Sequence, residues 1–160
     1  MAQKYQINLV NENTTARLAQ CVAQFIKPPF IIYLSGDLGA AKTTFSRYFI
    51  QARGHSGPVK SPTFTIVEPY ELGDECIFHF DCYRIQDPEE LEYLGIRDYI
   101  TSESICLIEW PERAANVLPP CDIHAMFRVI TSTERSVIWH AVSAQGQIVL
   151  QQLKNQWEDK

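Results

Sequence analysis

Residues 33–45 read YLSGDLGAAKTTF and carry the strongest indication of the fold. From Gly36 to Thr43 this stretch follows the phosphate-binding pattern G-x-x-x-x-G-K-[ST] at every fixed position but one, because Ala41 replaces the second glycine. A continuous apolar run at 30–35 predicts a buried strand before it, and residues 42–54 predict a helix after it. Strand, glycine loop and helix are the context that the motif needs, so we favour a nucleotide site over a simple strand-to-helix turn.

The loop residues predict how a nucleotide is held. Backbone N–H groups would surround the phosphate oxygens, and the helix N-terminus would add partial positive charge. Lys42 is expected to bridge the β- and γ-phosphates, and Thr43 to place its hydroxyl on Mg²⁺. No N-K-x-D guanine motif occurs, which favours adenine as the base of the nucleotide. The candidate nucleotide-binding residues of the loop are Gly36, Asp37, Leu38, Gly39, Ala40, Ala41, Lys42, Thr43 and Thr44.

Two apolar runs end in a carboxylate, as a strand beside a magnesium site should. CIFHFD ends at Asp81, and ICLIE ends at Glu109. Glu109 is the stronger metal candidate because its run is cleaner, and Asp81 is expected to orient water or to support the metal indirectly. Either residue alone could be an ordinary acid at a strand end. The catalytic candidates are therefore Lys42, Asp81 and Glu109, and the metal candidates are Thr43 and Glu109.

Three further features lie outside the loop. The segment KSPTFT at 60–65 offers Ser61 and Thr63 as a switch that senses the γ-phosphate through a hydroxyl, although it could equally form a proline-containing turn. Trp110 is assigned to the core in preference to a partner surface. His79 faces away from the phenylalanines beside it in its strand, and we expect a hydrogen-bonded rather than a catalytic histidine. No Ser-His-Asp or Cys-His arrangement can be assembled from the sequence.

Bulk composition limits the possible functions. The 160 residues are enough for one domain, expected to span 1–160, and 46% apolar with 21% charged residues is ordinary for a soluble globular protein. The net charge of -5 argues against wrapping nucleic acid. No apolar run approaches the roughly 20 residues of a membrane span, and no signal peptide is evident. Five scattered cysteines predict reduced thiols in a cytoplasmic protein, and no zinc site.

The remaining segments complete the expected fold, a single P-loop NTPase-like α/β domain whose mixed parallel and antiparallel sheet is flanked by helices. Two strands joined by a turn at Gly73-Asp74 must be antiparallel, because so short a turn cannot connect parallel strands. Periodicity and turn residues predict strands at 5–10, 63–72, 75–85 and 104–110, helices at 11–26 and 87–100, a hairpin over 125–143 and a tail that is a strand or a helical end.

Five blocks stand in order along the chain: GDLGAAKTT (36–44), SPTFTIVEPY (61–70), HFDCYRI (79–85), DPEELEYLGIRDYI (87–100) and ICLIEWPERA (105–114). Together they resemble the TsaE/YjeE family over roughly residues 30–120. Its members are small P-loop ATPases of the bacterial machinery that makes threonylcarbamoyladenosine at position 37 of certain tRNAs. The resemblance is specific because HFDCYR and EEL-x-x-LGI-x-DY belong to no general P-loop scheme.

The resemblance implies ligands, partners and residue roles. Family members bind ATP and Mg²⁺, hydrolyse ATP slowly alone, and engage a heterodimer of TsaB and TsaD, so tRNA is a partner only indirectly. It implies that Thr43 and Glu109 bind Mg²⁺ and that Asp81 serves in hydrolysis. It also implies that the SPTF segment behaves as a switch and that Trp110, beside Glu109, lies near the site. Adenine contacts come from the N-terminal region and the C-terminal hairpin of the family, where Thr14 and Arg135 are the candidates. An arginine could stack on a base, but a solvated turn residue is the alternative for Arg135.

Ala41 is the departure from the family pattern. The glycine at this place usually has a positive φ, which costs alanine about 1–2 kcal/mol. We expect the fold to survive and ATP affinity to fall by roughly one to two decades, since about 1.4 kcal/mol is tenfold. Two functions stay open: an ATPase in tRNA modification, and a nucleotide-responsive interaction module with little or no hydrolysis. A small-molecule kinase is disfavoured because the arginines are dispersed rather than gathered in a lid.

Overall fold

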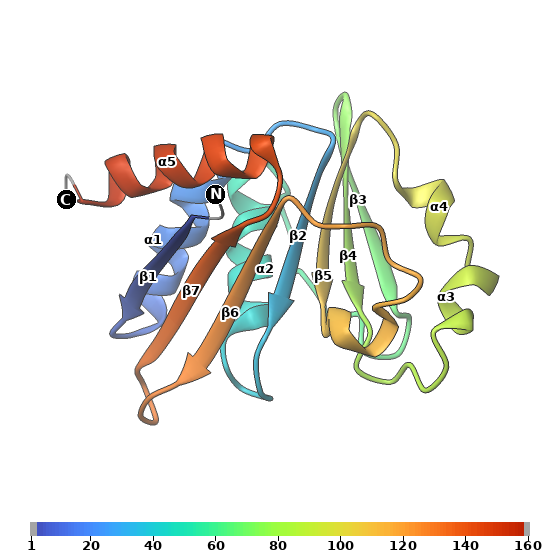
Figure 1. Ribbon diagram of the computed structural model, residues 1–160, viewed down its shortest axis with the longest axis horizontal. Helices are drawn as coiled ribbons and strands as arrows, with labels where there is room; N and C mark the ends of the chain where they lie inside the picture. The colour runs from blue at the N-terminus through green and yellow to red at the C-terminus, as the bar shows by residue number, and fades with distance from the viewer. Residues whose placement is uncertain (1–2, 159–160) are drawn as a thin grey trace.

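Seven strands form one mixed sheet in the computed structural model, which describes residues 3–158 (Figure 1). Their order across the sheet is β1-β7-β6-β2-β5-β4-β3. The central strands β6, β2, β5 and β4 are parallel, whereas β1, β7 and β3 run antiparallel to their neighbours. The expected mixed α/β sheet is thus confirmed. The strands are β1 Lys4–Leu9, β2 Phe30–Ser35, β3 Val67–Leu72, β4 Glu75–Asp81, β5 Ser104–Glu109, β6 Ile123–Val129 and β7 Arg135–Ala141.

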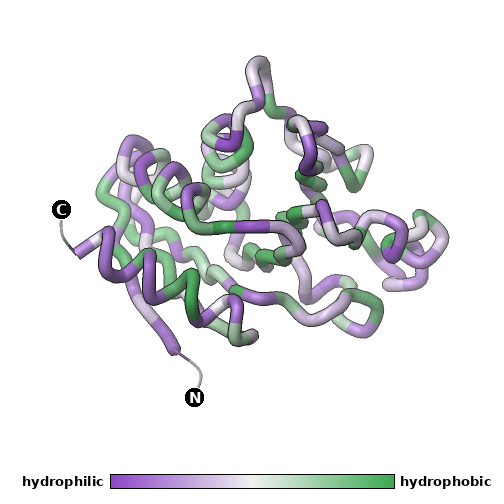
Figure 2. Tube along the Cα trace, turned by 90° about the horizontal axis from the view of Figure 1, so that it is seen from above, coloured by the Kyte–Doolittle hydropathy of each residue, from purple (hydrophilic) through white to green (hydrophobic). Residues whose placement is uncertain are grey.

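Helices pack against both faces of the sheet because the central strands are apolar on both sides. In β5, Leu107 belongs to the core on one face, and Cys106 and Ile108 belong to the core on the other. Figure 2 shows the hydrophobic segments gathered in the interior. The first core is covered by α1 Glu12–Ala23, α2 Lys42–Ala52 and α5 Ala144–Glu158, and the second by α3 Glu89–Tyr93, α4 Ile96–Tyr99 and the 3-10 helix η1 Pro111–Ala114.

The parallel strands bring the chemical groups to one edge of the sheet. The phosphate-binding loop follows β2, and Asp81 and Glu109 end β4 and β5. Asp81 lies directly opposite Glu109 in the register of the two strands. In a parallel sheet with crossover helices, this edge at the carboxyl ends of the strands is where ligands bind.

Several element boundaries differ from those expected. The helix expected over 87–100 is two short helices, because Gly95 takes φ 74° and interrupts it. The strand expected from residue 63 begins only at Val67, because Ile66 takes φ 70° after a turn. The tail is the helix α5. Among residues 3–158, no helix combines the length and hydrophobicity that crossing a bilayer would require.

Candidate functional site

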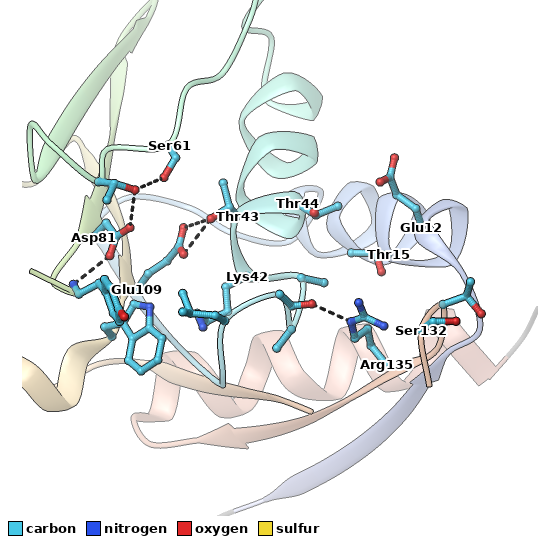
Figure 3. A pocket seen from close by; sticks show the side chains of 18 of the residues that line it. Glu12, Thr15, Lys42, Thr43, Thr44, Ser61, Asp81, Glu109, Ser132 and Arg135 are labelled. Atoms are coloured by element: carbon cyan, nitrogen blue, oxygen red, sulfur yellow. Dashed lines mark hydrogen bonds between the residues drawn. The ribbon is translucent and has the colours of Figure 1, made fainter. Parts of the chain in front are cut away.

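A cavity of about 520 Å³ opens above the carboxyl edge of the sheet (Figure 3). The phosphate-binding loop and the start of α2 form its floor, with the ends of β4 and β5 at one side. The first turn of α1 and the β6–β7 hairpin close the other side. Its volume lies within the range typical of small-molecule sites.

The loop holds three residues in conformations that favour glycine. Gly36 has φ 143°, and a Cβ built on it would lie 2.6 Å from the backbone oxygen of Phe127, so no side chain fits there. Gly39 has φ 79°. Ala41 has φ 87° and ψ 16°, the left-handed conformation expected for this place in the motif. Its side chain packs partly against the core and also lines the cavity.

Lys42 is a buried cation at the floor of the cavity, with 4% of its surface exposed. Its ammonium donates hydrogen bonds to the carbonyl oxygens of Gly36 and Asp37 and lies 4.2 Å from the ring centroid of Trp110. Burial lowers the pKa of Lys42, while the negative charge of Glu109 opposes that shift. Within residues 3–158, no carboxylate forms an ion pair with this ammonium. A buried cation in that situation suits an anionic ligand such as a phosphate.

Thr43 and Glu109 meet beside the lysine. The Thr43 hydroxyl donates to the two carboxylate oxygens of Glu109 over 3.0 and 3.2 Å. Glu109 is 2% exposed and is also bonded to the buried His79. A hydroxyl and a carboxylate are hard oxygen donors, and Mg²⁺ in phosphate-transfer sites uses one or two protein groups with phosphates and water as the rest. These two residues therefore fit the ion that the motif calls for.

Asp81 lies on the same side of the cavity as Glu109 (Figure 3). One of its oxygens accepts from the backbone N–H of Tyr83 at 2.9 Å, and the other from the Thr63 hydroxyl at 3.4 Å. Ser61 is 2.7 Å from Thr63, so the expected switch segment reaches the site through these two hydroxyls. Burial raises the pKa of Asp81, although the Tyr83 hydrogen bond opposes the shift. A partly desolvated carboxylate is a better proton acceptor than a solvated one.

Trp110 lines the cavity, as the resemblance implied, and its side chain also packs against the second core, as the sequence alone favoured. It directly follows the last residue of β5 and has φ 57°, which turns the chain and leaves the ring half-buried. The ring packs on the Lys42 ammonium and on Tyr83, whose ring centroid is 5.0 Å away. The sequence alone could not show this turn, because β5 was expected to continue through Trp110.

At the far end of the cavity, the structure brings Arg135 to the site but not Thr14. The guanidinium of Arg135 donates to the Gly39 carbonyl at 2.9 Å. Thr14 is buried in α1, where its hydroxyl and N–H both donate to the side chain of Asn11. The residues of this end that sequence reasoning missed are Asn11, Glu12, Thr15, Ser132 and Thr133. The helix-capping pattern at Asn11 was the available signal for the α1 end.

A Ser–His contact that the sequence did not indicate lies in β2 and β6. Ser35 Oγ is 2.6 Å from His124 Nε2, and Glu112 accepts from the same serine at 3.3 Å. The acid therefore contacts the serine and not the imidazole, which is not the order of a catalytic triad. Neither Ser35 nor His124 lines the cavity.

Comparison with known proteins decides the family. The model of the family described as threonylcarbamoyl adenosine biosynthesis protein TsaE matches residues 9–137. The chain belongs to the TsaE family. The matched range of this TsaE chain includes the phosphate-binding loop, both strand-end acids and Arg135.

Individual relatives agree with this assignment. A Haemophilus influenzae protein named tRNA threonylcarbamoyladenosine biosynthesis protein TsaE is 57% identical over 93 residues, covering 58% of this chain and 59% of that protein. The Bacillus subtilis protein of the same name is 35% identical and covers 90% of each chain. A crystal structure of Bacillus subtilis YdiB superposes with a TM-score of 0.84 at 29% identity, over 98% of this TsaE chain and 97% of the other. The overall fold is thus that of a solved structure.

Proposed function

We propose that this chain binds ATP with Mg²⁺ and hydrolyses the ATP, acting as an accessory subunit in threonylcarbamoyl modification of adenosine 37 in tRNA. The observation that carries the proposal is the arrangement at the floor of the cavity. There, a buried lysine without an ionic partner among the described residues lies beside a hydroxyl–carboxylate pair, Thr43 and Glu109. Membership of the TsaE family supports the place of this activity in tRNA modification.

Each residue has a distinct role in the proposed reaction. The backbone N–H groups from Asp37 to Thr44 hold the phosphate oxygens, and Lys42 neutralises their charge. Thr43 and Glu109 hold Mg²⁺, which when bound stabilises negative charge on the phosphoryl group being transferred. Asp81, whose pKa burial raises, accepts a proton from the attacking water.

The proposed partner is the TsaB–TsaD heterodimer, and contact with tRNA is through that heterodimer. The net charge of -5 supports the indirect route, because direct capture of a polyanion requires a basic surface. A cytoplasmic location stays a prediction that fits this role.

The left-handed Ala41 favours a second function, a nucleotide-responsive interaction module with little or no hydrolysis. With φ 87°, an alanine carries strain that a glycine would not, and the residue lines the cavity. Catalysis depends more steeply on placement of the phosphates than binding does. Hydrolysis is therefore the activity that this substitution would reduce first.

One experiment separates the two functions. ATP hydrolysis is measured for the chain with the TsaB–TsaD heterodimer present, with Lys42→Ala as the control, and association is followed by pull-down with and without ATP. We expect association and a hydrolysis rate that Lys42→Ala abolishes. Association with equal background hydrolysis in both chains would support the interaction module. A chain that neither associates nor hydrolyses ATP would contradict both functions.

A further inference from the structure

His79 lies beneath the proposed metal site and is hydrogen-bonded to it. It belongs to β4, is completely buried, and has its Nε2 atom 2.5 Å from Oε2 of Glu109. Among residues 3–158, Glu109 is the one hydrogen-bond partner found for this ring, and Nδ1 has none. A histidine that only filled the core would not need the site carboxylate as its partner.

The position of His79 follows from the strand register. Every second residue of β4 faces the side of the sheet that α2 covers, and these residues are Ile77, His79 and Asp81. On the adjacent strand, Glu109 is opposite Asp81. His79 precedes Asp81 by two residues in β4, so its imidazole lies on the same face of the sheet as the two acids. His79 therefore reaches the Glu109 carboxylate from below, while Thr43 reaches it from the start of α2.

We propose that His79 is a positioning residue for Glu109: its Nε2–H donates to Oε2 and fixes the orientation in which the carboxylate faces the metal. This inference rests on the proposed function. The unpartnered Nδ1 indicates the tautomer, because a buried N–H without an acceptor costs more than a bare ring nitrogen does.

The carboxylate needs this second donor. Glu109 is almost completely buried, and Thr43 offers one hydroxyl proton to its two oxygens. Without His79, Oε2 would keep only its 3.2 Å share of the Thr43 hydroxyl, and the carboxylate would lose the contact that holds it from the core side. Hydrogen-bond partners that orient metal-binding groups typically change metal affinity by about 10–100-fold when they are removed.

Two substitutions of His79 separate positioning from packing. His79→Gln keeps an N–H donor that reaches about as far as Nε2, and His79→Leu keeps an apolar side chain without a donor. The measurement is calorimetric binding of a non-hydrolysable ATP analogue, once with EDTA and once across a Mg²⁺ titration. We expect His79→Leu to bind the analogue normally in EDTA but to need about 10–100-fold more Mg²⁺ for half-saturation. His79→Gln should restore the Mg²⁺ requirement to near that of the unaltered chain.

Two results would overturn the positioning role. One is a His79→Leu protein whose Mg²⁺ dependence equals that of the unaltered chain. The other is equal impairment of His79→Leu and His79→Gln, since a loss that a donor cannot rescue comes from packing. If the unaltered chain itself shows no Mg²⁺-dependent binding, the proposed function fails instead.

A spectroscopic measurement on the unaltered, ligand-free chain tests the hydrogen bond independently of binding. Long-range ¹H–¹⁵N correlation distinguishes a protonated ring nitrogen from a bare one. We expect Nε2 of His79 to be protonated, as the hydrogen bond to Glu109 requires. A proton on Nδ1 with a bare Nε2 would overturn the inference, whatever the substituted proteins do.

Discussion

At the level of single residues, Ala41 is the position where the residue type does not suit the backbone conformation that the loop requires. The loop requires a left-handed conformation there, and alanine adopts it at φ 87°. The conformation belongs to the fold itself, so its strain reduces the stability of the folded chain by about 1–2 kcal/mol relative to glycine. Part of that difference is offset because glycine has more freedom in the unfolded chain, by about 0.4–1 kcal/mol.

Ala41→Gly should therefore stabilise the protein and tighten nucleotide binding. We expect the melting temperature to rise by about 2–4 °C, since roughly 1 kcal/mol shifts a protein of this size by that amount. Removing the methyl group from the cavity should improve ATP affinity by about tenfold, the lower end of the range expected from sequence. Thermal unfolding and calorimetry measure the two effects. Equal melting temperatures and equal dissociation constants for both chains would refute this account of Ala41.

Thr43 provides a second test at this scale. Thr43→Val keeps the shape of the side chain but removes the oxygen that bonds to Glu109, whereas Thr43→Ser keeps it. In Thr43→Val, Mg²⁺ should enhance ATP binding about tenfold less than in the unaltered chain, because one of the two proposed protein ligands of the metal is removed. Calorimetry at several Mg²⁺ concentrations measures this, with Thr43→Ser as the matched control. A Thr43→Val protein that responds to Mg²⁺ as the Thr43→Ser protein does would contradict the assignment.

For the helices and strands, local sequence patterns predicted the type of most segments, whereas contacts between segments set several of their boundaries. The strand at Phe30–Ser35 and the hairpin turn before Arg135 follow from apolar runs and turn residues, and both were predicted. The break in the helix at Gly95 and the late start of β3 were not predicted. Both depend on a positive φ, at Gly95 and at Ile66, that only the surrounding packing imposes.

The candidate site likewise contains residues that the sequence predicts and residues that only the folded chain brings together. The loop, Asp81 and Glu109 could be found from sequence because each follows an apolar strand that ends at one sheet edge. The partner of His79 could not be found, because it lies on a strand 30 residues away. The role of Asn11 as a cavity residue was missed for a similar reason, since a helix pattern does not show which way the chain turns at its end.

The start of α1 gives a prediction for this scale. The side chain of Asn11 caps the helix by accepting from the Thr14 N–H at 3.0 Å. Asn11→Ala should lower the free energy of unfolding by about 1 kcal/mol. Asn13→Ala is the matched control, because Asn13 is exposed within the same helix and caps nothing. Urea denaturation of both proteins measures the difference, and an equal free energy of unfolding in the two would show that the cap contributes nothing.

At the scale of the whole molecule, buried thiols make the fold sensitive to alkaline pH. Burial raises the pKa of Cys82 and Cys106 to about 12 and that of Cys121 to about 11, from 9.0. These thiols stay neutral in the folded chain while they ionise in the unfolded chain, so their contribution to stability is complete below pH 9 and is lost as the pH rises toward the folded values.

The free energy of unfolding should therefore fall above pH 9 by about 1.4 kcal/mol per pH unit for each of the three thiols. Urea denaturation at pH 8, 9 and 10 under reducing conditions measures the slope. Cys82→Ala is the control, because it removes one of the ionising groups and should reduce the slope although it also lowers stability at every pH. A stability that stays constant from about pH 8 to 10 would contradict this picture of the second core.

Calorimetry with Mg²⁺ present, on the unaltered chain and on Lys42→Ala, tests whether ATP binds in the cavity. We predict saturable binding of one ATP per chain. We also predict that affinity falls by about 10–100-fold in Lys42→Ala, because hydrogen bonds to charged groups contribute about 1.5–3 kcal/mol. Melting temperatures of the two proteins establish that both are folded. No binding by the unaltered chain, or equal affinity in a folded Lys42→Ala protein, would contradict the account.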